Sequence, residues 1–158
     1  MKEKKAVSSS QVVMTQLVLP THTNALDTVF GGTVMSWIDI AGAIAAQRHS
    51  ATDVVTASID QLNFIAPIRK GWVVNLKASV NFTSRTSMEI GVRVDAENPK
   101  TSEMFHTASA YMTFVALGSD GRPSPIPGLI LESDIEKRRF AAAEKRRAQR
   151  LANKNNDS

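Results

Sequence analysis

Apolar and polar residues alternate along two segments in the middle of the chain. In the segment 72–82 every second residue is apolar or small, and the segment 88–96 repeats this pattern. Because successive side chains of a β-strand point to opposite faces, the period of two predicts two strands, each with one buried and one largely wet face. The polar residues 83–86 connect them, so we expect a long antiparallel hairpin.

Three further segments have the composition of strands. The segment 11–20 is rich in Val and Leu and ends at Pro20, and the segments 54–64 and 105–117 also show strand patterns. The last of them is apolar or small on both faces, which predicts a central strand or a subunit interface. Gly and Pro residues in the segment 118–128 then end the predicted sheet.

A different pattern follows the first predicted strand. From Thr33 to Arg48 the chain has no proline, and nearly every residue is apolar or small. This pattern predicts a helix, and a helix that is apolar all round must be enclosed by protein. The order strand, helix and four strands predicts the α+β class, with one antiparallel sheet wrapped around one long central helix.

Length and charge divide the chain into three parts. A chain of 158 residues favours a single domain, which we place at residues 11–131, after a flexible N-terminus at residues 1–10. Residues 132–158 form a tail that carries most of the net charge of +4. Its alternating charges and alanines predict a basic, exposed helix, and contact with a nucleic acid or another anion is the less favoured interpretation.

The composition argues against several classes of protein. There is no cysteine, hence no disulfide, thiolate metal ligand or cysteine nucleophile, and this fits a cytoplasmic protein. We expect neither a signal peptide nor a membrane span, because no segment is apolar enough for either. His22, His49 and His106 lack the spacing of a metal site, and there is no G-x-S-x-G motif, so we expect neither a metal enzyme nor a serine hydrolase.

One carboxylate, Asp39, lies within the apolar helix, where burial of an unpaired charge is costly. At about 100 degrees per residue, Gly32, Ser36 and Asp39 share one side of the helix and form a polar stripe that reaches its N-terminus. Backbone N–H groups beside Gly31 and Gly32 can bind an oxyanion there, and a carboxylate about two turns away suits attack on an ester or thioester. In the alternative interpretation, Asp39 bonds a neighbouring strand and the glycines only permit tight packing.

Several motifs occur in one order between residues 12 and 128: T-N at 23–24, F-G-G at 30–32, W-I-D at 37–39 and N-F-x-x-P-I at 63–68. This combination resembles the acyl-CoA thioesterases of the hotdog fold, the acyl-CoA hydrolase group that includes the bacterial YciA-type enzymes and the brain acyl-CoA hydrolase. The resemblance implies hydrolysis of acyl-CoA to a carboxylic acid and free CoA, with no cofactor besides the CoA of the substrate. It also implies dimers with their sheets side by side, often three such pairs in a hexamer.

The resemblance further assigns roles to residues. The family's catalytic aspartate falls on Asp39 and its catalytic asparagine on Asn24, which by itself would be interpreted as a turn former; the two are expected to face one site from different subunits. Asp39 would activate water, the role we favour over direct attack, while Asn24 and the N–H groups of the glycine pair, Gly31 and Gly32, stabilise the oxyanion. The implied CoA contacts are Val55, Thr56, Asn63, Phe64, Arg85, Thr86 and Ser87, with Arg69, Lys70 and Arg122 as weaker candidates.

Two other functions remain open on the sequence. One is an acyl-CoA binding or sensing module without turnover, suggested by the basic tail and by Asp27, where the family often has glycine. Asp27 adds a carboxylate to the turn that presents Asn24, which puts catalytic strength and substrate range in question. The other is a hotdog hydratase or dehydratase, but these sites usually pair a histidine with the acid, and the helix has no histidine beside Asp39.

Overall fold

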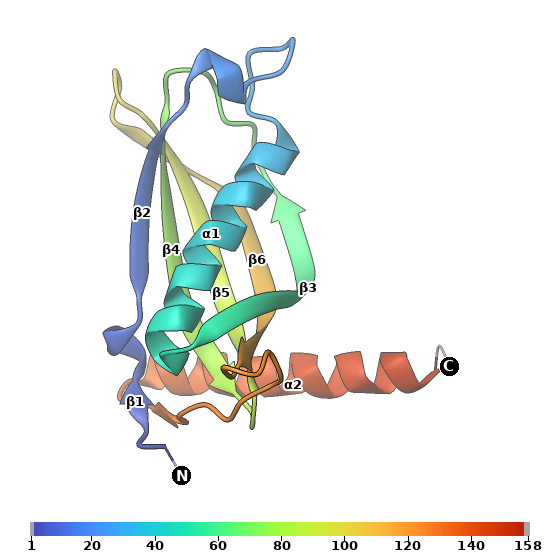
Figure 1. Ribbon diagram of the computed structural model, residues 1–158. Helices are drawn as coiled ribbons and strands as arrows, with labels where there is room; N and C mark the ends of the chain where they lie inside the picture. Colours follow the sequence, from blue (N-terminus) through green and yellow to red (C-terminus); the bar gives the residue numbers. More distant parts are fainter. Residues whose placement is uncertain (1, 157–158) are drawn as a thin grey trace.

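A five-stranded antiparallel sheet carries one long helix on each face in the computed structural model, which describes residues 2–156 (Figure 1). The sheet has the order β2-β4-β5-β6-β3, so β2 and β3 are its edges. Its strands are β2 (Val12–Leu17), β3 (Asp53–Phe64), β4 (Val73–Thr83), β5 (Ser87–Asn98) and β6 (Glu103–Leu117). The helices are α1 (Gly31–Ser50) and α2 (Asp134–Asn156), and the shorter elements are β1 (Lys5–Ala6), η1 (Val7–Ser9), η2 (Pro20–His22) and β7 (Leu129–Ile130).

The predicted α+β architecture is confirmed, including the central helix and the position of each strand. The two alternating segments are β4 and β5, which pair as an antiparallel hairpin. The segment 105–117 falls within β6, and β6 lies between β5 and β3, which explains why both of its faces are apolar or small. The alternation was informative because it reflects direct burial of one face of each strand.

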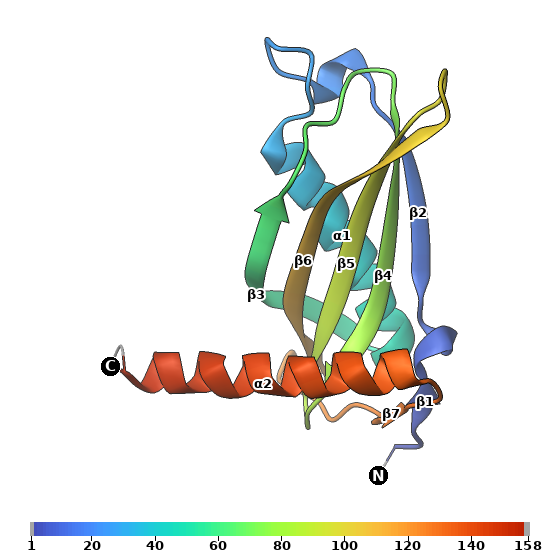
Figure 2. The same ribbon diagram turned by 180° about the vertical axis from the view of Figure 1, so that it is seen from behind.

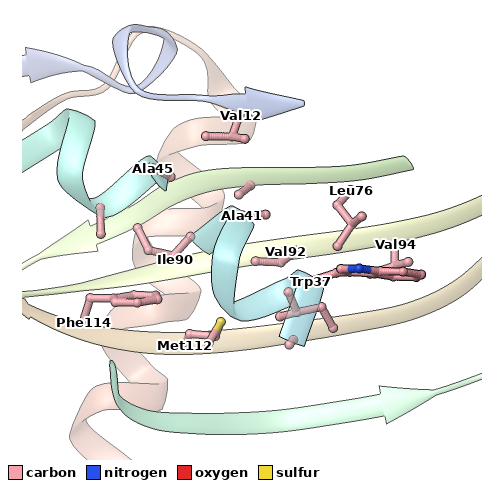
Figure 3. Packing of buried hydrophobic residues seen from close by; sticks show 14 of the residues in the cluster. Val12, Trp37, Ala41, Ala45, Leu76, Ile90, Val92, Val94, Met112 and Phe114 are labelled. Carbon is pink, nitrogen blue, oxygen red and sulfur yellow. The ribbon is translucent and has the colours of Figure 1, made fainter. Parts of the chain in front are cut away.

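Helix α1 packs across the inner face of the sheet and forms the core (Figure 3). Trp37, Ala41 and Ala45 lie on its buried side, and the strands contribute Leu76, Ile90, Val92, Val94, Met112 and Phe114. A Cβ atom added to Gly42 would lie only 3.0 Å from the Phe114 ring. Gly42 therefore lets the helix approach β6 more closely than a larger residue would allow.

The prediction that protein encloses α1 on all sides is wrong for a single chain. Met35 is 38% exposed and Ile40 is 47% exposed, and Gly32 and Ser36 are exposed as well. The sheet covers only the side of the helix that carries Trp37 and the alanines, because β3 ends the sheet beside α1. The opposite side of α1 is left as an apolar surface with a polar stripe.

Residues 5–10 belong to the packed fold, although we expected the whole segment 1–10 to be flexible. Lys5–Ala6 pairs in parallel with Leu129–Ile130, and the Val7 side chain is only 2% exposed. The valine joins the main hydrophobic core, and this burial holds the segment in place.

Helix α2 crosses the outer face of the sheet, opposite α1, and its C-terminal end extends past β3 (Figure 2). The predicted C-terminal helix is confirmed, but its first half is packed and not simply exposed: the Phe140 and Phe82 rings lie 4.9 Å apart between centroids. Arg146 donates two hydrogen bonds to Glu89, from Nε to Oε1 at 2.8 Å and from Nη2 to Oε2 at 2.9 Å. Glu89 is only 4% exposed, so this ion pair fastens α2 to the sheet.

We expect Arg146→Ala to lower the free energy of unfolding by about 3 kcal/mol, because Glu89 would stay buried without its counter-charge. Arg150 provides a matched control on the same helix, since its pair with Asp60 is more exposed, at 29% for each side chain. Arg150→Ala should cost about 1 kcal/mol or less. Urea unfolding of the two variants measures the difference, and equal losses would show that the buried pair does not anchor α2.

Candidate active site

Asp39 lies on the third turn of α1, half-buried, and one of its oxygens is held by the neighbouring strand. The Thr56 hydroxyl on β3 donates a hydrogen bond to Asp39 Oδ1 at 2.6 Å. Within residues 2–156 no hydrogen bond to Asp39 Oδ2 is found. Asp39 thus bonds a neighbouring strand, as the alternative interpretation of the sequence expected, and its second oxygen remains available for chemistry. Thr56, assigned to CoA on the resemblance, contacts the carboxylate.

The start of α1 has backbone donors without acceptors. Phe30 caps the helix without a side-chain hydrogen bond, and its carbonyl accepts from the N–H groups of Thr33 and Val34 at 3.0 and 3.2 Å. The N–H groups of Gly31 and Gly32 have no acceptor within the described part of the chain. A Cβ atom added to Gly32 would meet nothing within 4 Å, so the space beside it is open. Free N–H groups at a helix N-terminus favour a negative charge.

Asn24 sits in a tight turn that fixes its side-chain oxygen. Asn24 Oδ1 accepts hydrogen bonds from the Leu26 N–H at 2.9 Å, the Thr28 N–H at 3.3 Å and the Thr28 hydroxyl at 3.2 Å. The side-chain Nδ2 makes no hydrogen bond with any residue from 2 to 156. Asn24 therefore combines the turn-forming role typical of asparagine with a free amide donor.

Asp27 adopts the left-handed backbone that the turn requires, with φ at 59°. Its carboxylate lies 3.6 Å from Lys70 Nζ, and both side chains are substantially exposed. Asp tolerates this conformation better than most residues, so the turn forms without glycine. Lys70, a weaker candidate for CoA binding, is paired with Asp27 here.

The Asn24 turn is joined to the loop that follows β3. Val29 donates to the Ile68 carbonyl at 2.8 Å, and Lys70 donates to the Asp27 carbonyl at 3.1 Å. A bridge between Thr28 and Arg69 lies between these bonds. The turn, the start of α1 and the end of β3 thus meet at one end of the sheet (Figure 1).

The end of β3 contributes its exposed residues to the same region. Phe64 is 52% exposed, and a Cβ atom added to Gly31 would lie 3.6 Å from its ring. Asn63 and Val55 are exposed on the same strand. Four of the implied CoA contacts, Val55, Thr56, Asn63 and Phe64, therefore lie on one strand, with Thr56 beside the carboxylate and Phe64 beside the start of α1.

The other predicted CoA contacts lie elsewhere. Arg85, Thr86 and Ser87 are at the β4–β5 turn, at the opposite end of the sheet from the Asn24 turn (Figure 1). The Arg85 and Thr86 carbonyls accept backbone hydrogen bonds from Ile126 and Ala116, which fix this turn. One chain alone does not bring these residues to Asn24.

Exposed apolar side chains surround the site and follow the open side of α1 and β3. The members of this apolar band are Leu26, Phe30, Met35, Ile40, Val55, Phe64 and Ile65, each more than a third exposed. Strand β3 pairs with β6 only, so its other edge is free within residues 2–156. A free sheet edge with several exposed apolar side chains nearby is typical of a protein–protein contact.

Each of the three histidines has a different partner, and His22 Nδ1 accepts a hydrogen bond from the Leu19 N–H at 3.0 Å. His49 is fully buried at the end of α1, where burial lowers its pKa, and its Nε2 donates to the Pro127 carbonyl at 2.7 Å. His106 Nδ1 lies 3.4 Å from Asp95. Over residues 2–156 we find no group of metal-ligating side chains and no helix long and apolar enough to cross a membrane.

Comparison with known proteins identifies the family of this chain. The thioesterase superfamily matches residues 26–103. The uncharacterized acyl-CoA thioester hydrolase YkhA of Bacillus subtilis is 40% identical over 134 residues, which are 85% of this chain and 78% of that protein. The chain belongs to the thioesterase superfamily, among the acyl-CoA thioester hydrolases. The resemblance read from the motifs is confirmed at the level of the family.

Other members of this thioesterase family extend the comparison. The mouse cytosolic acyl coenzyme A thioester hydrolase is 41% identical over 140 residues, but the chain spans only 37% of its length. The structure of an apo-hexameric acyl-CoA thioesterase matches with a TM-score of 0.93 at 38% identity, covering 96% of this chain and 97% of that one. The Staphylococcus aureus acyl-CoA hydrolase in complex with butyryl coenzyme A and coenzyme A matches at 0.86 and 36% identity, covering 97% and 96%.

Proposed function

We propose that this chain is an acyl-CoA thioesterase, which hydrolyses the thioester to a carboxylic acid and free CoA. The support from the structure is chemical: a half-buried carboxylate with one free oxygen, free N–H groups at a helix start and a free amide donor on Asn24. A base and oxyanion donors are the two components that attack on a thioester carbonyl requires. The names of the relatives indicate the same reaction.

The spacing of three residues in a structural relative supports this assignment most directly. The S. aureus hydrolase has been solved with alanine in place of an asparagine, of an aspartate and of a threonine. In that chain the asparagine and aspartate are 15 residues apart, and the aspartate and threonine 17 apart. Asn24, Asp39 and Thr56 have the same two intervals. The same three residue types at the same spacing support one site made of these residues.

The proposed reaction uses Asp39 as the general base. Asp39 Oδ2 takes a proton from water as the water oxygen bonds to the carbonyl carbon, while Thr56 holds Oδ1. Asn24 Nδ2 and the free N–H groups of the glycine pair hold the oxyanion of the tetrahedral intermediate. The intermediate collapses with cleavage of the C–S bond, and the CoA thiolate takes the proton from Asp39. The products are the carboxylic acid and free CoA.

The site is completed, in this proposal, by a second copy of the chain. Asp39 comes eight positions after Gly31, a rise of about 12 Å along the helix axis, so the carboxylate lies far from the N–H donors at the start of its own helix. Two copies that pair along their free β3 edges would bury the apolar band and bring Asn24 of one copy toward Asp39 of the other. The hexameric thioesterase among the structural relatives supports a further assembly into three such dimers.

The same arrangement accounts for the distant CoA candidates. A two-fold axis between the β3 edges reverses the direction of the second copy. The β4–β5 turn of one copy, with Arg85, Thr86 and Ser87, then lies at the same end as the Asn24 turn of the other. Arginine and hydroxyl donors there suit the phosphates of CoA. A cytoplasmic location is proposed as well, in line with the cytosolic name of the mouse relative.

The experiment that tests this function follows thiol release from short, medium, long and aromatic acyl-CoAs. We expect free CoA and carboxylic acid in equal amounts with at least one class of acyl group. A chromatographic assay of both products, with heat-denatured protein as the control, measures this. Tight binding of every acyl-CoA without thiol release would contradict the proposal and support the binding module.

A further inference from the structure

The orientation of the Asn24 side chain is set by its own turn. The second side-chain torsion of asparagine is broad and roughly two-fold, so the side chain alone does not decide which way its oxygen faces. Here two backbone N–H groups, those of Leu26 and Thr28, point at the same side-chain atom. A backbone N–H only donates, so that atom must be the oxygen Oδ1 and the amide Nδ2 must face away.

Thr28 supplies two of the three donors. Its N–H lies 3.3 Å and its hydroxyl 3.2 Å from Asn24 Oδ1. Asn24 in turn donates its backbone N–H to the Thr28 carbonyl at 2.9 Å. The two residues are thus bonded through backbone and side chain, and Thr28 is half-buried.

Thr28 is itself held from the other side. The bridge to Arg69 engages Thr28, and hydrogen bonds between residues 27–29 and the loop after β3 lie on both sides of it. The backbone of Thr28 is therefore held in place by the protein before any ligand binds. Such preorganisation matters most for a group that must stabilise charge in the transition state.

We propose that Thr28 is a positioning residue, which holds Asn24 Oδ1 so that Nδ2 is the atom that donates to the developing oxyanion. The inference rests on the proposed thioesterase function. If the amide turned by half a rotation, its partially negative oxygen would face the oxyanion and oppose the reaction. Thr28 acts through Asn24 and needs no contact of its own with substrate.

The test compares Thr28→Val, which keeps the shape and the N–H but removes the hydroxyl, with Thr28→Ser, which keeps the hydroxyl. We expect Thr28→Val to lower kcat about fivefold, as for the loss of one hydrogen bond, with KM within about twofold. Thr28→Ser should stay within about twofold of the wild type. In an Asn24→Ala background, Thr28→Val should cause no further loss, because the residue it positions is gone.

Three results would overturn this inference. The first two are an unchanged kcat in Thr28→Val and a loss in Thr28→Ser equal to that in Thr28→Val. The third is a full additional loss of kcat when Thr28→Val is added to Asn24→Ala, because Thr28 would then act on another group. The orientation is also measurable without activity: in selectively labelled protein, NMR should show no strong contact between the Asn24 side-chain NH2 protons and the Thr28 amide proton. A strong contact refutes the orientation, whereas a wild type that releases no thiol refutes the proposed function instead.

Discussion

Asp39→Asn should lower kcat for acyl-CoA hydrolysis by at least about a hundredfold, with little change in KM. The side-chain amide can still accept the hydrogen bond from the Thr56 hydroxyl, which lies 2.6 Å from Asp39 Oδ1 in the native structure. It cannot take a proton from water. The variant therefore removes the base while keeping the shape of the site.

The matched control for this variant is Asp53→Asn, which makes the same chemical change at an exposed carboxylate at the start of β3. We expect the Asp53 variant to keep the wild-type kcat and both variants to elute as the same oligomer on size exclusion. Thiol release under saturating acyl-CoA is the measurement. If Asp39→Asn kept the wild-type kcat, Asp39 would not be the catalytic base.

Asn24→Ala should also lower kcat by about a hundredfold, because removal of one oxyanion donor typically has an effect of this size. The alanine variant also removes Oδ1, the acceptor for the turn, so a second variant is needed to separate the two roles. Asn24→Asp keeps an oxygen for the Leu26 and Thr28 donors but has no N–H to donate.

We expect Asn24→Asp to be as inactive as Asn24→Ala, while its thermal unfolding midpoint stays closer to that of the wild type. Activity assays and thermal scans on both variants give the two readouts. An active Asn24→Asp would mean that this residue shapes the turn and donates nothing to the oxyanion.

The sheet and α1 could be predicted because their patterns are local. Alternation along β4 and β5 and the apolar run of α1 each report direct burial against the core. The packing of α2 against the sheet could not be predicted, because it depends on Arg146 and Glu89, which are 57 residues apart in the chain. A basic helix with few apolar residues has the sequence pattern of an exposed helix, so the sequence alone does not predict that it packs against the sheet. The burial of Val7 likewise depends on distant residues.

The catalytic candidates were found from the sequence, but their contacts were not. The stripe from Gly32 to Asp39 follows from helix geometry, and Asn24 came from the resemblance. The bond from Thr56 to Asp39 depends on how β3 lies beside α1, which no local pattern encodes. The role of Thr28 was missed as well; its only sequence signal is a hydroxyl residue four positions after an asparagine in a turn.

The exposed side of α1 bears on how copies of the chain assemble. An apolar helix predicts enclosure, and one chain does not enclose it: Met35 and Ile40 remain exposed beside the free edge of β3. Burial of this surface by a second copy satisfies the pattern that the sequence shows. In the proposed dimer, the sequence pattern of α1 would thus reflect the assembly as well as the single chain.

Mixing two inactive variants tests most directly whether Asn24 and Asp39 of two copies act on one thioester. Asp39→Asn and Asn24→Ala protein, unfolded together and refolded at equal amounts, should form mixed dimers in which one of the two sites has both residues intact. We expect thiol release to recover to about a quarter of the wild-type rate, since half of randomly formed dimers are mixed. Each variant refolded alone should stay inactive. No recovery in mixed oligomers that are shown to form would contradict a site shared between subunits.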